Sequence, residues 1–249
     1  MQITFWGVRG SVPTPISSEQ IQSRIAAVIQ RATPKDLVNE NSREAFLAKL
    51  PPYIMKTVGG NTTCIEVILD NGTCIIFDCG TGIRELAARH AKRNDFIRDY
   101  YIFFTHFHWD HLQGLPFFAP PAYHPDCGLH FHSPVKGFER YLWDQMRMPY
   151  FPVTMETMSA KKTFTELDAQ PLKIGNAEIT WRSMKHPGGC YAYKIKENGG
   201  QFIFSTDTEL TEDDFVRNSE NKSFFEDVDA LVIDSQYTLD EALEKYDWG

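Results

Sequence analysis

Seven residues of this chain constrain its structure more than any others: the run Thr-His-Phe-His-Trp-Asp-His at positions 105–111. Four apolar residues precede the run and have the composition of a buried strand. If the chain leaves that strand extended, His106 and His108 point to the same side, because side chains of extended residues alternate. The residues that follow are expected to begin a short helix, which would turn Asp110 and His111 back toward the same point.

These four side chains are typical of a metal centre. Imidazole and carboxylate groups are ligands that Zn²⁺, Mn²⁺ and Fe²⁺ accept. Four such groups in six residues are too many for one small ion without strain. We therefore expect two neighbouring ions, one held by His106 and His108 and the other by Asp110 and His111. The alternative is a cluster of core histidines, which is disfavoured because burying these groups without ligands would be costly.

Two later residues at the ends of expected strands could complete the centre. His186 is followed by Pro-Gly-Gly just after the strand expected at 179–184, and a tight loop there would let the imidazole approach a metal. By itself, a His-Pro-Gly loop is more often only a turn. Asp207 ends the apolar strand expected at 201–205, where a carboxylate can give one oxygen to each of two ions. It could instead cap a helix near 211–215, but neighbouring hydroxyls could do so too, and we favour the bridging role.

The remaining acidic residues and histidines are interpreted differently. Asp78 also ends an apolar strand and is predicted to hold the metal-binding loop from behind the ligands. Asp234 follows a final buried strand, and we expect it to hydrogen-bond a ligand histidine or to act on the substrate. The histidines interpreted as structural are His90, His124, His130 and His132.

The composition is ordinary for a soluble globular protein, with 249 residues of which 42% are hydrophobic. No apolar run approaches the roughly 20 residues that span a bilayer, and the N-terminal residues lack the pattern of a secretory signal. The net charge of −8 disfavours broad binding to nucleic-acid backbones. This net charge is compatible with a small anionic substrate, because bound metal supplies positive charge at the site. Five widely spaced cysteines fit reduced thiols, so we expect a cytoplasmic protein without membrane contact.

The order of expected elements predicts two packed sheets with helices outside them. A hairpin turn is indicated at 71–72, between two strongly apolar runs. We find no internal repeat or low-complexity linker, so a single domain over residues 1–249 is expected. The segment at about 16–56 is interpreted as a helical insertion that could be a surface helical pair, a lid or a dimer contact; a homodimer is one alternative. Helices are expected from residue 18 and at 42–50, 83–90, 135–146 and 241–246.

The order of the candidate ligands resembles that of the metallo-β-lactamase superfamily of hydrolases. The matching residues are His106, His108, Asp110, His111, His186 and Asp207. Further segments are similar to one bacterial branch, which is close to the cyclic phosphodiesterases and the tRNA 3′-processing endonucleases; they are residues 5–11, 59–64, 78–82 and 234–238. The resemblance covers most of the chain. It implies an α+β fold, a four-layer αββα sandwich, with two metal ions at one edge, usually zinc or manganese.

Two departures from this pattern affect what we expect. In this branch a last histidine normally follows a Trp-Gly pair near the C-terminal end, whereas no histidine follows position 186 in this sequence. Unless the chain is truncated, the second ion therefore lacks one ligand, and its site is expected to be weaker or empty. The tRNA-processing enzymes also carry a His-Glu motif where this chain has Asp234 and Ser235.

The expected function is a metal-dependent phosphodiesterase that acts on a small or cyclic nucleotide. A hydroxide bridging two divalent ions about 3.5–4 Å apart would attack phosphorus in line while the ions neutralise the developing charge. Asp110 would orient that hydroxide, and Asp234 is the second catalytic candidate. The candidate contacts to the substrate phosphate are Arg9, Asn61 and Thr62. For Arg9, a surface salt bridge is an equal alternative.

Two other functions stay open from the sequence. A hydrolase of a lactone, thioester or β-lactam would use the same centre. A non-catalytic sensor of metal or nucleotide would fit a chain that has lost its second ion. Counting the bound metal ions and measuring turnover of bis(p-nitrophenyl) phosphate would separate these functions from the phosphodiesterase. Two ions with turnover of this phosphodiester support the phosphodiesterase, and one ion with binding but without turnover supports the sensor. Zinc is the expected metal, with manganese and iron as alternatives.

Overall fold

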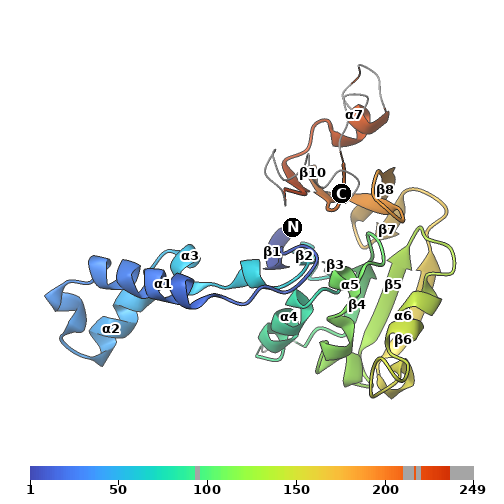
Figure 1. The fold of residues 1–249 in the computed structure, drawn as a ribbon. Coiled ribbons are helices and arrows are strands. Elements are labelled where there is room, and N and C mark those ends of the chain that lie inside the picture. The colour runs from blue at the N-terminus through green and yellow to red at the C-terminus, as the bar shows by residue number, and fades with distance from the viewer. Residues whose placement is uncertain (93–95, 210–215, 217–219, 236–249) are drawn as a thin grey trace.

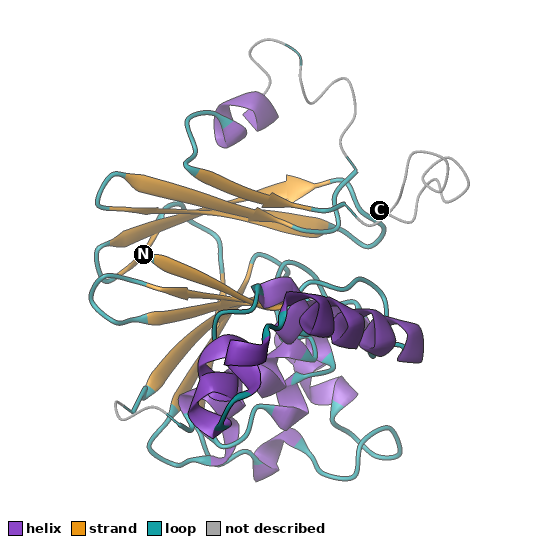
Figure 2. Ribbon diagram, turned by 90° about the vertical axis from the view of Figure 1, so that its left-hand side faces the viewer, coloured by secondary structure: helices purple, strands orange, loops and turns teal. Residues whose placement is uncertain are grey.

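Two β-sheets lie face to face in the computed structural model, which describes residues 1–92, 96–209, 216 and 220–235 (Figure 2). The first sheet consists, in spatial order, of β1 (Gln2–Gly7), β2 (Cys64–Ile68), β3 (Cys74–Phe77), β4 (Asp99–Phe103), β5 (Gly128–Ser133) and β6 (Lys161–Glu166). Its first three strands are antiparallel, and those from β3 to β6 are parallel. The parallel strands therefore all end at the same edge, where their loops can meet.

The second sheet is a meander with one added strand. It consists, in spatial order, of β11 (Ala230–Ile233), β10 (Gly200–Ser205), β9 (Cys190–Glu197), β8 (Ala177–Met184) and β7 (Leu172–Ile174). The strands from β7 to β10 are antiparallel, and β11 runs parallel to β10. Gly72 adopts a φ of +84° and closes the β2–β3 hairpin at the turn expected from the sequence.

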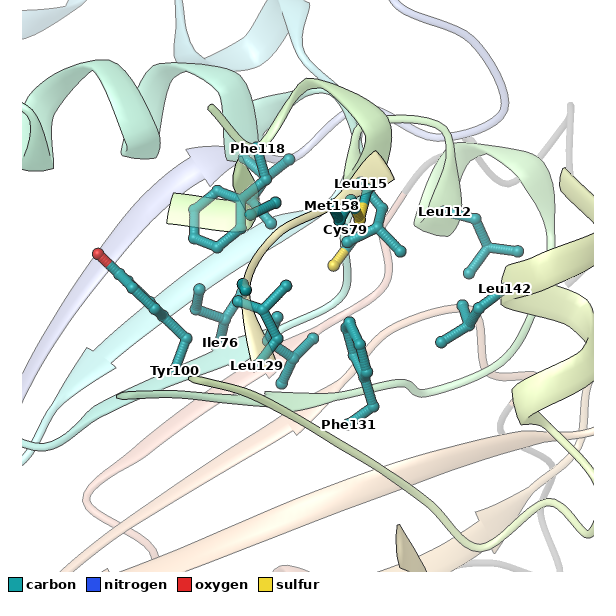
Figure 3. Packing of buried hydrophobic residues seen from close by; sticks show 14 of the residues in the cluster. Ile76, Cys79, Tyr100, Leu112, Leu115, Phe118, Leu129, Phe131, Leu142 and Met158 are labelled. Atoms are coloured by element: carbon teal, nitrogen blue, oxygen red, sulfur yellow. The ribbon is translucent and has the colours of Figure 1, made fainter. Parts of the chain in front are cut away.

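The central strands β2 and β3 of the first sheet are buried on both faces, which explains why they read as nearly continuous apolar runs. Residues on one face pack against the second sheet, and the ring of Phe77 lies 5.4 Å from those of Tyr193 and Phe204. Residues on the other face, such as Ile76 and Leu129, pack under a layer of helices (Figure 3). Two separate cores therefore fix the sheet between its neighbours.

Helices cover the outer face of the first sheet more fully than that of the second. The helices packed on the first sheet are α4 (Gly82–His90), α5 (Trp109–Leu112) and α6 (Glu139–Gln145), with short 3₁₀ turns η3 (Leu115–Phe117), η4 (Pro121–Tyr123) and η5 (Met155–Thr157). In the described part of the chain, α7 (Glu220–Phe225) is the one helix beyond the second sheet. The architecture is the expected αββα sandwich. The helices expected at 211–215 and 241–246 lie outside the described residues.

The predicted insertion is an arm of short helices that projects from the sandwich (Figure 1). It contains α1 (Ser18–Arg31), η1 (Pro34–Leu37), α2 (Glu40–Leu47) and α3 (Pro52–Met55), and η2 (Val58–Gly60) joins it to β2. Ser17 caps α1 through a capping box with Gln20, so this helix begins at residue 18 as expected. Neither α1 nor α2 contains a buried residue, and the arm is anchored near its base by Leu50 and Ile54.

Two helices begin at residues other than those predicted from the sequence, and the helix expected at 42–50 ends at Leu47. The second arm helix begins at Glu40 because Asn39 caps it, two residues before the predicted start. The helix expected at 135–146 begins only at Glu139, since Gly137 has a φ of +67° that helical residues do not adopt. All five cysteines are buried and free, as expected. Among the described residues, no helix is long and apolar enough to cross a membrane.

Candidate metal centre

All six predicted ligands meet at one edge of the sandwich. The first four come from the segment between β4 and the end of α5, which belongs to the first sheet. His186 follows β8 and Asp207 follows β10, so these two come from the second sheet. The centre therefore lies where loops of both sheets converge.

The ligand atoms form two groups that share one carboxylate. Within each group these atoms lie within 4.8 Å of one another; the groups are His106, His108, His186 and Asp207, and Asp110, His111 and Asp207. Asp207 Oδ2 lies 3.5 Å from His106 Nε2 and 3.4 Å from His111 Nε2. In the first group, His186 Nε2 lies 3.0 Å from His108 Nδ1. Asp207 is thus shared, as the predicted bridging role requires, and the second group holds three side chains with no fourth imidazole or carboxylate among the described residues.

Orphaned nitrogen atoms indicate that the centre fits cations. His106 Nε2 and His111 Nε2, which face the other ligand atoms, are buried and have no hydrogen-bond partner. Buried imidazole nitrogens without partners cost free energy, which coordination of a divalent ion would remove. Because the donors are imidazoles and carboxylates without thiolates, the set suits zinc, manganese or iron.

Asp78 and Thr105 orient two of the histidines. Asp78 is fully buried, and its carboxylate lies 2.8 Å from His111 Nδ1 and accepts bonds of 2.8 Å from the amide and the hydroxyl of Thr105. The Thr105 hydroxyl in turn lies 3.0 Å from His106 Nδ1. When both Nδ1 atoms carry the proton, both Nε2 atoms are left free as ligands. The structure thus places Asp78 behind the ligands, as predicted. Sequence analysis missed Thr105, although it directly precedes the histidine run.

The segment that contains α5 is hydrogen-bonded to the backbone of the loop that follows β3. The Cys79 amide donates to the His111 carbonyl, and the Gly114 amide donates to the Cys79 carbonyl, both at 2.8 Å. A Cβ on Gly114 would lie 2.0 Å from the Gly80 carbonyl oxygen, so this position has no room for a side chain. The Ser11 amide, from the loop after β1, donates to Asp110 Oδ2 at 2.8 Å. Ser11 is a second contact that sequence analysis missed.

The electrostatics of the centre suit positive charge. Burial disfavours a charged His111, but the surrounding carboxylates, Asp78 first, raise the pKa of this imidazole well above its ordinary value. Burial and the neighbouring His111 lower the pKa of His106. Although burial opposes ionisation of Asp207, its contacts with His111 and His106 lower the pKa of this carboxyl. Without an ion, the Asp207 carboxylate is therefore ionised and His106 is neutral, whereas His111 holds a proton that a bound cation would displace.

Of the other predicted site residues, Arg9 and Asp234 lie beside the centre. Together with Asp207 they line a cavity of about 240 Å³. Among the described residues, Arg9 forms no ion pair, so the surface salt bridge is not seen there. Asn61 accepts a hydrogen bond of 3.2 Å from the Thr81 hydroxyl and does not line this cavity. Thr62 is fully buried and accepts from the Thr81 amide at 2.8 Å. Substrate contacts by Asn61 and Thr62 therefore stay predictions.

The histidines interpreted as structural make contacts outside the centre. His90 Nε2 lies 2.6 Å from a Glu66 oxygen, and His130 lies 3.0 Å from Asp99. The ring of His132 stacks on Phe103 at 4.7 Å, and burial lowers the pKa of this histidine to about 4. The Asp126 amide donates to His124 Nδ1.

Two mixed sheets stacked between helices, with imidazoles and carboxylates gathered at their common edge, define a metal-dependent hydrolase of the metallo-β-lactamase fold. Residues 73–248 match the family model described as the beta-lactamase superfamily domain. Because the match spans most of the sequence, the chain belongs to this family.

The chain is also similar to curated ribonucleases. It is 27% identical to ribonuclease BN of Cronobacter sakazakii over 128 residues, which are 49% of this chain and 38% of that protein. It is 29% identical to ribonuclease Z of Salinispora arenicola over 132 residues, which are 51% of this chain and 40% of that protein. The aligned part thus spans about two fifths of the length of these relatives. These names agree with the branch that the sequence motifs indicate.

Solved structures with a similar arrangement are more distant in sequence. Human tRNase Z, short form, is 15% identical with a TM-score of 0.48, over 84% of this chain and 71% of that one. Zinc-bound PqqB from Methylobacterium extorquens is 16% identical with a TM-score of 0.49, over 70% of this chain and 57% of that one.

Proposed function

We propose that the protein is a phosphodiesterase that hydrolyses a small or cyclic nucleotide with the help of two divalent ions. The observation that carries this proposal is the position of Asp207, whose carboxylate belongs to both groups of candidate ligands. Two ions that share a carboxylate lie close enough to act on one phosphoryl group. Such a pair suits phosphodiester chemistry, in which negative charge develops on the oxygens around phosphorus.

Different residues would bind the ions, bind the substrate phosphate and accept a proton. His106, His108, His186 and Asp207 would hold one ion, and Asp110, His111 and Asp207 the other. When bound, the ions supply Lewis-acid chemistry. Arg9 would bind a phosphate oxygen of the substrate, because this residue lines the same cavity as Asp207. Asp234 lines the same cavity and would accept a proton or orient a substrate hydroxyl.

The choice of substrate rests on the relatives and on charge. Both curated relatives are named as ribonucleases, which supports phosphodiester hydrolysis over hydrolysis of lactones or thioesters. The net charge of −8 argues against a large RNA, because broad backbone binding needs a basic surface. A small nucleotide satisfies both observations. Zinc is our first choice of metal, with manganese and iron as alternatives.

The proposal is tested with the purified chain loaded with zinc or manganese. We expect two bound ions per chain by elemental analysis and turnover of bis(p-nitrophenyl) phosphate and of cyclic nucleotides. Asp207→Ala should abolish turnover, and Arg9→Ala should raise KM about tenfold or more, as expected for loss of a charged hydrogen bond. His130→Ala, far from the centre, is the control and should keep wild-type kinetics.

Other outcomes would replace the proposal. Turnover of p-nitrophenyl acetate or a lactone, with none of phosphodiesters, would identify an esterase or lactonase. One bound ion per chain, with nucleotide binding but without turnover, would identify a sensor.

A further inference from the structure

A second cavity of about 540 Å³ lies where the arm joins the sandwich. Its walls come from segments far apart in the sequence. Arg9 lies after β1, Arg24 lies on α1, and Arg84 lies on α4. All three line the cavity, together with Asn61 and the backbone of η2.

Arg9 connects this cavity to the metal centre. The same residue lines the smaller cavity that contains Asp207 and Asp234. Its backbone is fixed, because the amides of Val8 and Arg9 both donate to the Asn61 carbonyl, at 3.0 and 2.9 Å. A molecule held at the ions by one end would therefore pass Arg9 and enter the second cavity with its other end.

The lining of the second cavity is positively charged, whereas the chain as a whole is negatively charged. The chain as a whole carries a net charge of −8, whereas three arginines line this cavity with Glu85 as the one acidic residue of the described lining. Glu85 pairs with Arg84 at 2.6 Å, and one nitrogen of Arg24 donates to the Lys56 carbonyl at 3.0 Å. Each guanidinium has five N–H donors, so both arginines keep donors for an anion.

The cavity wall is fixed by backbone contacts. The Thr14 amide donates to the Gly60 carbonyl at 2.9 Å, and a Cβ on Gly60 would lie 2.7 Å from the Thr14 carbonyl oxygen. Pro13 and Pro15 restrict the same wall. An anion would therefore meet walls that are already in place, which lowers the cost of ordering on binding.

We propose that Arg24 and Arg84 bind a second phosphate of the substrate in this cavity, while the scissile phosphodiester lies at the metal centre. The inference rests on the proposed function and narrows it. The preferred substrate is a small nucleotide with a phosphodiester at one end and a further phosphate at the other, and a nucleotide without that phosphate binds more weakly. Arginine suits this role because its planar fork binds phosphate oxygens in pairs.

A matched pair of chromogenic substrates tests the proposal. Thymidine 5′-(p-nitrophenyl phosphate) carries the scissile diester alone, and its 3′-phosphorylated form carries the second phosphate as well. We expect KM of the zinc-loaded enzyme to be about tenfold or more lower for the 3′-phosphorylated substrate, with similar kcat. Arg24→Ala and Arg84→Ala should each raise KM about tenfold for that substrate and leave KM for the other unchanged.

Two control variants and one conservative variant accompany this measurement. Arg43→Ala on α2 and Arg98→Ala before β4 remove arginines that do not line the cavity, and both should keep the wild-type preference. Compared with Arg24→Ala, Arg24→Lys should restore part of the preference for the 3′-phosphorylated substrate. Lysine keeps the positive charge but lacks the planar guanidinium group that binds two phosphate oxygens at once. Equal KM values for the two substrates, unchanged by Arg24→Ala and Arg84→Ala, would overturn the inference and leave the proposed function intact.

A binding measurement separates this inference from catalysis. By calorimetry, thymidine 3′,5′-bisphosphate should bind about tenfold more tightly than thymidine 5′-monophosphate, and Arg24→Ala and Arg84→Ala should remove the difference. If neither chromogenic substrate is hydrolysed by the zinc-loaded protein, the proposed function fails. The cavity would then be an anion site without a substrate role, provided that the bisphosphate still binds through these arginines.

Discussion

At the scale of single residues, the metal centre depends on side chains that do not touch the ions. Asp78 combines complete burial with three hydrogen bonds at 2.8 Å, one to His111 and two to Thr105. Burial raises the pKa of this carboxyl above its ordinary value, and its contacts with His111 and Thr105 offset only part of that shift. The position of an aspartate at the end of an apolar strand predicted this role. The role of Thr105 in orienting His106 follows only from the distances of its hydroxyl to Asp78 and to His106 Nδ1.

Removing the Asp78 carboxylate should weaken zinc binding without removing a ligand. In Asp78→Ala, His111 loses the partner that fixes its ring and its tautomer, so we expect zinc affinity to fall about 10–100-fold. Competition with a zinc-chelating dye measures the change, and far-UV circular dichroism checks the fold. Asp99→Ala, which removes the surface partner of His130, is the control and should bind zinc normally. Wild-type zinc affinity in folded Asp78→Ala would contradict the role assigned to Asp78.

At the scale of elements, strand ends and close backbone contacts position the ligands. The apolar runs and the 71–72 turn predicted the hairpin and the strand that precedes the histidine run. Helix boundaries were less accurate: Asn39 and Gly137 determine where the helices of residues 40–47 and 139–145 begin. The contact between α5 and the loop after β3 could not be predicted from the sequence. It consists of backbone hydrogen bonds, and the side chains of these residues show no periodicity that would indicate them.

Gly114 provides a test of that contact. Gly114→Ala would place a Cβ against the Gly80 carbonyl, and α5 would have to move away from the loop with Asp110 and His111. We expect a loss of about 2–3 kcal/mol in the free energy of unfolding and weaker zinc binding, measured by urea denaturation and by dye competition. Gly59→Ala is the matched control, since its Cβ would meet nothing within 4 Å. If Gly114→Ala were as stable as Gly59→Ala, the close approach would not matter for stability.

At the scale of the whole molecule, the candidate ligands link the two sheets. The segment that follows β4 provides four ligands, and loops of the second sheet provide His186 and Asp207. Bound ions would therefore hold the sheets together at their common edge. A single domain, a homodimer, a cytoplasmic location and the role of the arm stay predictions.

Zinc should therefore stabilise the entire fold. Free zinc at 100 times its dissociation constant adds about 2.7 kcal/mol to the free energy of unfolding. For a chain of this size, that corresponds to an increase of about 5–10 °C in Tm, measured by calorimetry with zinc and with a chelator. The double variant His186→Ala/Asp207→Ala should lose this increase. Equal Tm values for the wild type with zinc and with chelator would argue against a metal that links the sheets.

The sequence by itself determined the types of ligand, the strand ends that carry them and the class of fold, because these follow from local periodicity and from residues close together in the chain. Only the tertiary structure decided that Thr105 and Ser11 orient ligands and that three distant arginines line one cavity. Such contacts form between segments separated by many residues, and their geometry depends on how two sheets and an arm pack, which no local pattern specifies.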